Sequence, residues 1–155
     1  MGALATVAII THVLAAIVWV GGMFFAHQVL RPAVPPIEAG PRQQLWTRVL
    51  ARFFNWVIAA IIVLLVSGFA IVFGVFGGFA DVGHYVHLMM GLGIIMMLLF
   101  FHLYFAPWPR FRAAVARQDW TEGQRQLDQI RRIVGINLVL GLVTAAIGAS
   151  GRYWG

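Results

Sequence analysis

The sequence contains no cysteine and no lysine among its 155 residues, and it has only five acidic residues. The missing cysteines exclude disulfide bonds, thiolate metal sites, iron–sulfur clusters and covalently attached c-type haem. Charged residues make up 10% of the chain and hydrophobic residues 61%, against about 25% and about 45–50% in typical soluble domains. A chain this short cannot bury so much apolar surface from water. We therefore expect one transmembrane domain, residues 1–155, whose main partner is the lipid bilayer.

Long apolar segments predict an all-α fold, an integral membrane four-helix bundle. The expected helices span about residues 3–30, 49–76, 82–106 and 121–150. The first segment is too long for a cleaved signal peptide and lacks a basic start, so we expect it to be retained. The proline-rich segment 31–41 is expected to form a connector without a helix. Pro107 and Pro109 are expected to end the third helix, and the spacing of Thr121 and Gln124 predicts a capping box for the fourth.

The arginines are distributed unevenly over the two sides of this topology. Ten of the eleven fall on one side: Arg31, Arg42, Arg48, Arg52, Arg110, Arg112, Arg117, Arg125, Arg131 and Arg132. Arg152 alone falls on the other side. Because basic loops stay in the cytoplasm, we expect both basic loops to be cytoplasmic and both termini outside, N-out/C-out. The charge thus indicates a multi-pass protein of a bacterial-type inner (cell) membrane and not a nucleic-acid-binding surface.

Four of the five histidines lie within the expected membrane spans, where polar side chains are costly. His12 and His27 lie on the first helix, and His87 and His102 lie on the third, each pair 15 residues apart. Fifteen residues correspond to about 22 Å of rise and to about 60° beyond four full turns. Because the two helices run in the same direction, His12 can lie level with His87, and His27 level with His102. His84 is expected near the outer surface, as an interfacial residue or an alternative ligand.

Facing imidazoles at two depths predict haem b, one or two per chain, with these four histidines as metal ligands. The macrocycles need room between the helices. Small residues are expected to supply it midway along the two helices: Gly21, Gly22, Gly91 and Gly93. A di-haem, bis-histidine protein of cytochrome b type would transfer electrons across or within the membrane. Its partner would be a quinone or another small redox molecule, and membrane oxidoreductase activity would follow.

Other polar residues near the span ends are expected to support these cofactor sites. Arg48 and Arg52 lie one turn apart at the basic end of the second helix, and Arg152 lies at the opposite end of the bundle. We expect these three arginines to bind haem propionates. Asn55 and Asn137 are expected to be buried amides that bridge helices.

Copper chemistry is an alternative for the same region of the chain. A run of imidazole and thioether side chains comprises His84, His87, Met89, Met90, Met96 and Met97, with Met23 on the first helix. Thioether sulfur is a soft ligand that selects Cu(I), so a Cu(I) pathway along the bundle is possible on chemical grounds. The methionines can equally serve to fill gaps in an apolar bundle.

Several segments of the chain resemble small membrane proteins of the copper resistance protein D (CopD) type. The similar segments are Thr11–Phe25, Arg52–Trp56, Tyr85–Met90 and Asn137–Gly141. The resemblance implies copper transport or resistance. A more distant resemblance to HemJ-type protoporphyrinogen oxidases implies a four-helix bundle with haem b, and ligands at His12 and His87. Those enzymes carry a lysine shortly after the third-helix histidine, where this chain has Met89 or Met90.

Overall fold

The computed structural model describes residues 2–154, except for the side chain of Arg152. Its elements are α1 (Ala3–Phe24), the π-helix η1 (Phe25–Leu30), α2 (Arg31–Ala33), α3 (Ala39–Gly74), α4 (His84–Phe105), α5 (Pro107–Ala116), α6 (Trp120–Ser150) and the 3-10 turn η2 (Gly151–Tyr153). The described residues contain no strand. Four helical segments are long and apolar enough to cross a membrane: Ala3–Ala33, Ala39–Gly74, His84–Ala116 and Trp120–Ser150. The predicted all-α fold with four membrane-spanning helices is confirmed.

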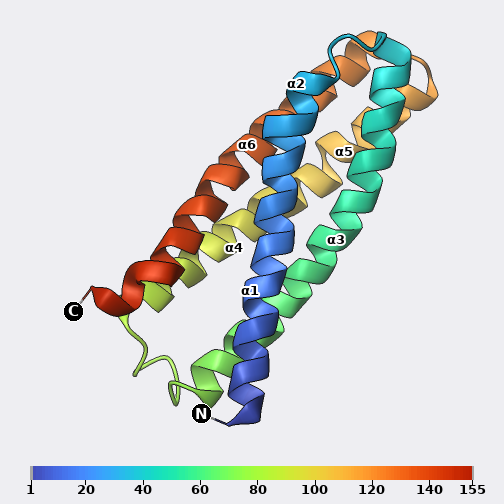
Figure 1. Ribbon diagram of the computed structural model, residues 1–155. Coiled ribbons are helices and arrows are strands. Elements are labelled where there is room, and N and C mark those ends of the chain that lie inside the picture. The colour runs from blue at the N-terminus through green and yellow to red at the C-terminus, as the bar shows by residue number, and fades with distance from the viewer. Residues whose placement is uncertain (1, 155) are drawn as a thin grey trace.

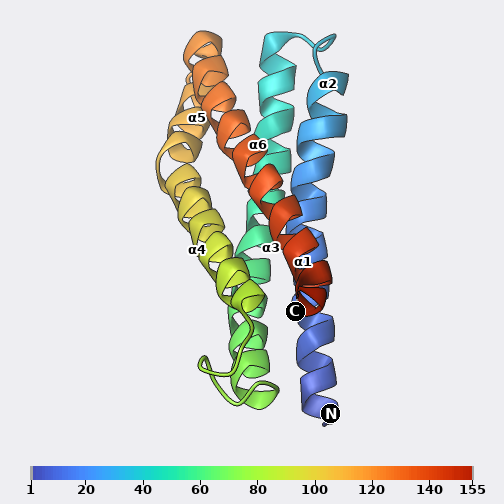
Figure 2. The same ribbon diagram turned by 90° about the vertical axis from the view of Figure 1, so that its left-hand side faces the viewer.

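The four long segments form an elongated bundle in which successive segments run in opposite directions (Figure 1). α1 begins and α6 ends at the same end of the bundle, which also holds the loop between α3 and α4. α1 packs mainly along α3, while α4 and α5 pack along α6. Figure 2 shows α4 and α5 on one side of the bundle and α1 on the other, with α6 crossing in front of α3. The bundle therefore consists of two helix pairs, α1–α3 and α4–α6.

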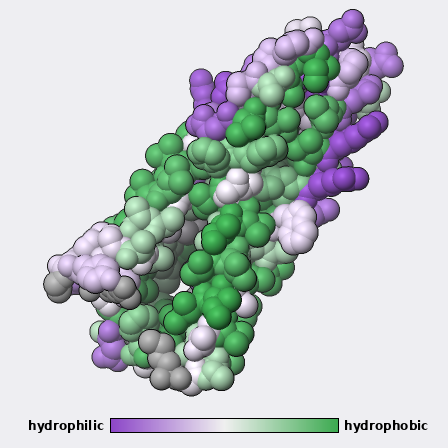
Figure 3. Space-filling model, viewed as in Figure 1, coloured by the Kyte–Doolittle hydropathy of each residue, from purple (hydrophilic) through white to green (hydrophobic). Residues whose placement is uncertain are grey.

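Apolar side chains cover most of the middle of the face of the bundle that Figure 3 shows. In the most apolar part of each span, only 17–33% of the residues are buried inside the protein. An exterior of this kind requires contact with lipid, and the chain is a multi-pass membrane protein. Hydrophilic residues gather at the end formed by α2, α5 and the first turns of α3 and α6, which we call the arginine-rich end. That this end faces the cytoplasm of a bacterial-type inner membrane stays a prediction.

Prolines begin helices at two places where the sequence predicted that they would interrupt them. α3 begins at Ala39, ten residues before the expected start, with Pro41 in its first turn. α5 begins at Pro107 itself. The first N–H groups of a helix have no partner within that helix, so a proline there loses no hydrogen bond. The prediction of a helix-free connector over 31–41 was wrong at both ends, since α2 also occupies Arg31–Ala33.

α6 begins with a different cap from the one predicted. The side chain of Asp119 accepts a hydrogen bond from the backbone N–H of Glu122, at 3.0 Å. The helix starts at Trp120, so Thr121 already lies inside the first turn and does not act as the cap.

Replacing Asp119 with alanine is expected to lower the free energy of unfolding by about 1 kcal/mol, because the Glu122 N–H loses its acceptor. The measurement is unfolding in mixed detergent micelles, followed by circular dichroism. Asp119→Asn is the matched control, because an asparagine side chain caps equally well. Equal losses in the two variants would show that the carboxylate charge and not the cap stabilises this end.

The two helix pairs are joined near the arginine-rich end by a buried glutamine. Gln43 of α3 is almost completely buried, and its Nε2 donates to the backbone carbonyl of Trp120 at 2.8 Å. Gly123 makes room for it, since a Cβ at this position would overlap the Gln43 Oε1. This hydrogen bond crosses from α3 to α6.

The centre of the bundle is filled by aromatic side chains. Phe54 of α3 is only 1% exposed. Its ring makes edge contacts with Phe100 of α4 and Trp108 of α5, with ring centroids 5.6 Å and 5.2 Å apart. Trp19 of α1 contacts Phe100 from the other side, at 6.4 Å. The space between α1, α3 and α4 at this depth is therefore occupied by side chains.

Candidate functional site

The glycines of α6 accept side chains from the helices packed against it. Cβ atoms built on these glycines would meet His27 at Gly135, Val20 and Met96 at Gly141, and Met89 at Gly148, each within 3 Å or little more. A Cβ at Gly151, the first residue of η2, would likewise meet Tyr85. Helices with small residues at such positions approach closely, as is common in membranes. α6 is thus the helix on which both α1 and α4 pack.

The contacts at Gly141 define the register between α1 and α4. A Cβ at Gly141 would lie 2.8 Å from Cγ2 of Val20 and 3.1 Å from Cε of Met96. Val20 and Met96 therefore lie at about the same depth in the bundle, and each residue of α1 lies at about the depth of the α4 residue whose number is 76 higher. By this register His87 lies at about the depth of His12, and His102 at about the depth of His27.

The ring of His12 faces α3 and is held by a serine. His12 Nδ1 lies 2.9 Å from Ser67 Oγ. The Ser67 hydroxyl donates to the backbone carbonyl of Val63, so its oxygen accepts the N–H of His12 Nδ1. This network assigns the proton of a neutral ring to Nδ1 and leaves a lone pair on Nε2. A histidine whose other nitrogen is oriented in this way is prepared to bind a metal ion through Nε2.

The histidines of α4 point away from the bundle. His87 is exposed and lies nine residues from Met96, which is buried against α6. Nine residues equal two and a half turns, so His87 lies on the opposite side of the helix from Met96. His84 and His102 are also exposed. The structure therefore places His12 and His87 at similar depths without bringing their imidazoles together.

His27 has partners on its own segment and on α6. It lies in the π-helix η1, and a Cβ at Gly135 would be 2.7 Å from its Nε2. This Nε2 lies 3.3 Å from Nη1 of Arg31. His102 is exposed on the other helix pair, so the inner pair of imidazoles is not assembled either. Within residues 2–154, no group of three or more histidine, aspartate or glutamate side chains is placed to hold a metal ion.

Of the four glycines expected to make room for a macrocycle, one is covered by a neighbouring side chain and three border open space. The ring of Phe53 fills the position where a Cβ of Gly22 would lie. Gly21, Gly91 and Gly93 have no other side chain within 4 Å of that position. Within the described residues, the structure therefore gives no support to a flat haem held between α1 and α4 midway through the bundle. The sequence analysis expected the first and third spans, α1 and α4, to face each other, whereas α1 packs mainly against α3.

The other predicted polar residues have mixed outcomes. Arg48 and Arg52 are exposed on α3, and the side chain of Arg152 lies outside the described part of the chain. Asn55 is exposed, so its predicted burial was wrong. Asn137 is buried, and its Nδ2 donates to the backbone carbonyl of Met96 at 3.1 Å, which confirms a bridge from α6 to α4. The Oδ1 of Asn137 is buried without a hydrogen-bond partner.

Two buried thioethers lie within about one helical turn of the depth of this unpaired oxygen. Met23 of α1 is 2% exposed and Met96 of α4 is 3% exposed, and both belong to one apolar cluster. Met23 lies one turn after Val20, which meets Met96 over Gly141. His12 lies eleven residues before Met23, about 20° from it on the helix, so the two share a face of α1.

Sequence reasoning missed Ser67, the residue that orients His12. The available signal was a single hydroxyl in the apolar segment Ala59–Ala70, at a depth that pairs with His12 only once α1 is known to pack on α3. Met23 and Met96 were recognised as possible ligands, but the sequence contained no indication that these two are the most deeply buried of the methionines between residues 2 and 154.

Comparison with known proteins gives one match. The model of the family described as copper resistance protein D matches residues 47–150, which is about two thirds of the chain and includes most of α3 and all of α4, α5 and α6. No curated protein and no solved structure matches significantly. The matched segment contains Ser67, Met96 and Asn137, while His12 and Met23 precede it. By this match, the chain belongs to the copper resistance protein D family.

Proposed function

We propose that the protein binds Cu(I) as its cargo inside the membrane and passes it along the bundle, in copper transport or copper resistance. Membership of the copper resistance protein D family supports this function. The ligand chemistry also supports it, because thioether sulfur and imidazole nitrogen both bind Cu(I), and soft thioethers select Cu(I) over harder metal ions. The chain has no thiolate that could do so.

The observation that carries the proposal is the burial of Met23 and Met96 about one helical turn apart in depth, on helices of different pairs. In this proposal their sulfur atoms form a central Cu(I) site. The Oδ1 of Asn137 is buried and unpaired, its side chain contacts the Met96 backbone, and it would supply a further neutral ligand. A site made of neutral ligands suits a monovalent cation in an apolar interior, where an additional unpaired carboxylate would be costly.

Two further sets of side chains would extend the path towards the end opposite the arginine-rich end. His12 has its Nε2 lone pair free, because Ser67 accepts the proton of Nδ1. His84, His87 and Met90 are exposed at the start of α4. Residues three positions apart on a helix are neighbours, so these three side chains would provide the first contact with copper at the surface.

Replacing both Met23 and Met96 with leucine is expected to weaken Cu(I) binding by about 100-fold, because both thioether ligands are lost. Leucine and methionine have similar volumes, so the packing around Gly141 should be kept. The measurement is competition for Cu(I) between the purified protein in detergent and a chromogenic Cu(I) chelator, together with the copper content of cells that produce the protein.

Met97→Leu is the matched control, because it removes a thioether from the same helix outside the proposed central site. Equal binding by the control and the double variant, both at the wild-type level, would contradict the proposal. The absorption spectrum of the same preparation tests the alternative, a haem protein that transfers electrons to a quinone-like partner. A stoichiometric haem b spectrum that is lost in His12→Ala would replace the copper proposal.

A further inference from the structure

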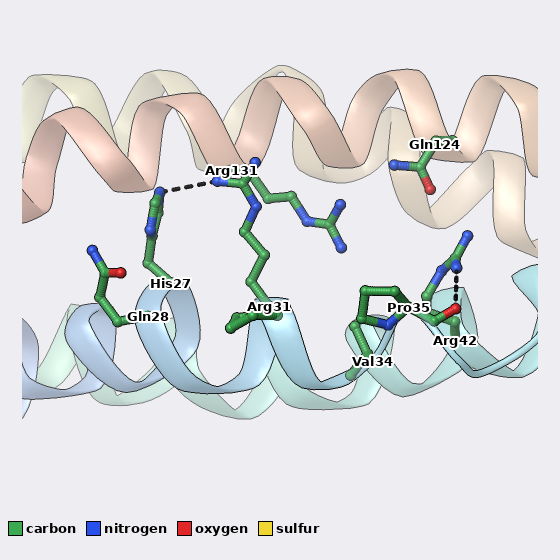
Figure 4. A pocket seen from close by; sticks show the side chains of 9 residues that line it. His27, Gln28, Arg31, Val34, Pro35, Arg42, Gln124 and Arg131 are labelled. Carbon is green, nitrogen blue, oxygen red and sulfur yellow. Dashed lines mark hydrogen bonds between the residues drawn. The ribbon is translucent and has the colours of Figure 1, made fainter.

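A pocket of about 500 Å³ opens at the arginine-rich end between α2, α3 and α6 (Figure 4). The charged and polar side chains that line it are Arg31, Arg42, Arg131, His27, Gln28 and Gln124, and two prolines and a valine of α2 and the segment after it complete its wall. Figure 4 shows Arg31 reaching from α2 towards α6, and Arg131 extending from α6 into the same space. Three guanidinium groups from three separate helices thus meet around one cavity.

The pocket carries an excess of positive charge. Its lining contains no carboxylate. The nearest acidic partner is Asp128, whose Oδ1 accepts from Arg131 Nη1 at 3.2 Å, but the Asp128 side chain is 58% exposed and that of Arg131 only 14%. The charges of Arg31 and Arg42 act unfavourably on Arg131. Three like charges held together with one exposed counter-charge favour an anion between them.

Buried N–H donors near the pocket lack acceptors. Arg131 Nε is buried without a hydrogen-bond partner, although its guanidinium is also held over the ring of Trp46, 5.3 Å from the centroid. His27 Nδ1 is likewise buried and unpartnered. Because a guanidinium only donates, His27 Nε2 accepts from Arg31, which leaves the proton of a neutral His27 on Nδ1. An unpaired buried donor is destabilising, and a ligand rich in acceptor oxygens would relieve this cost.

The depth of the pocket indicates which anion it meets. Arg31 follows directly after the uncharged stretch that ends at Leu30, and on α6 the last arginine before the apolar part is Arg132. The pocket therefore lies where the apolar exterior gives way to the hydrophilic end (Figure 3). Phosphate groups of lipids lie at this level of a membrane. Basic pockets between transmembrane helices bind anionic headgroups, and arginine binds phosphate in bidentate fashion.

We propose that this pocket is a binding site for a phosphate group, supplied by the headgroup of an anionic phospholipid. Arg31, Arg42 and Arg131 hold the phosphate oxygens, and the apolar wall of the segment after α2 lies beside the acyl chains. The first arginine of the pocket, Arg31, lies eight residues beyond Met23 of the proposed copper site, and the phosphate proposal does not depend on the copper proposal.

The test measures retention of lipid by the purified protein with native mass spectrometry. Phosphatidylglycerol is one arm, zwitterionic phosphatidylcholine is the second, and inorganic phosphate added as a competitor is the third. Arg42→Gln and Arg131→Gln are each expected to weaken phosphatidylglycerol binding by about tenfold or more, since each removes charged hydrogen bonds. Arg48→Gln is the matched control: it removes the same charge from an exposed site on α3 outside the pocket.

Selective retention of phosphatidylglycerol that is lost in the two pocket variants and kept in Arg48→Gln supports the proposal. Displacement of that lipid by inorganic phosphate at low concentration would identify free phosphate as the source of the bound group. If Arg131→Gln does not fold, Arg42→Gln decides, because Arg42 makes no contact with the Trp46 ring. Equal weakening in Arg42→Gln and Arg48→Gln, or retention of phosphatidylcholine to the same degree, would overturn the proposal.

Discussion

Replacing Gly141 with leucine is expected to lower the free energy of unfolding by about 3 kcal/mol, the upper part of the range for overpacked cores. A Cβ alone would lie 2.8 Å from Val20 and 3.1 Å from Met96. The remaining atoms of leucine have no space to enter, so α1 and α4 would both have to move away from α6. Because Val20 and Met96 belong to different helix pairs, the substitution separates the two halves of the bundle.

The measurement is reversible unfolding in mixed micelles, with tryptophan fluorescence as the signal. Gly91→Leu is the matched control, since Gly91 is exposed on α4 and no other side chain lies within 4 Å of its Cβ position. We expect it to be neutral or slightly stabilising, because leucine favours a helix over glycine. Similar losses in both variants would mean that α6 does not pack closely against α1 and α4 at Gly141.

Replacing Phe54 with alanine is expected to lower the free energy of unfolding by about 3 kcal/mol. Its ring contacts Phe100, Tyr104 and Trp108, and no neighbouring side chain can fill the space that it leaves. In lipid the transfer of an apolar side chain into the protein contributes little, since the solvent is itself apolar. The loss comes instead from missing dispersion contacts around the cavity, which lipid cannot reach.

Trp56→Ala is the control for this prediction. Trp56 lies two residues further along α3, is 65% exposed, and faces the lipid-covered exterior. Its removal is expected to change the unfolding free energy by about 0.5 kcal/mol or less, as for most surface positions. A loss at Trp56 as large as that at Phe54 would show that contacts with detergent or lipid, and not the aromatic cluster, stabilise this part of α3.

The four spans were predictable because a single physical requirement determines them. Lipid demands a continuous apolar helix of sufficient length, and this requirement can be read from composition along the chain. The ends of the helices were less predictable. A proline in the interior of a helix breaks it, whereas a proline in the first turn is accepted. The sequence does not show that Pro41 and Pro107 lie in the first turns of α3 and α5 and not in a helix interior.

For the candidate site, the sequence predicted the depth of each histidine in the bundle but not the direction in which its side chain points. The spacing of histidines along α1 and α4 indicates how deep each lies, because rise per residue is constant. The direction in which a ring points depends on which helix packs beside it, and that is decided by contacts far apart in the sequence. His12 meets Ser67 of α3, and His87 meets the exterior. The same limit applies to Asn55 and Asn137, which were both expected to be buried bridges between helices. Asn55 is exposed and Asn137 is buried, because the neighbouring helix packs on the side of Asn137 and not on that of Asn55.

The pocket lined by Arg31, Arg42 and Arg131 could not be predicted from the sequence. Arginines near span ends have a sufficient explanation in membrane topology, so nothing distinguishes Arg31, Arg42 and Arg131 from Arg48 or Arg52. Only the packing of α6 against the segment that ends α1 brings Arg131 towards Arg31.

The hydrogen bond from Gln43 to Trp120 ties the two helix pairs together close to one extremity of the molecule. The bonds from His12 to Ser67 and from Asn137 to Met96 each stay within a single pair. Between this bond and the opposite end, the two pairs meet through apolar contacts, such as Trp19 with Phe100 and Val20 with Met96 over Gly141. Apolar contacts do not fix a direction as a hydrogen bond does, so Gln43 sets the alignment of the two pairs at the arginine-rich end while shape complementarity sets it elsewhere.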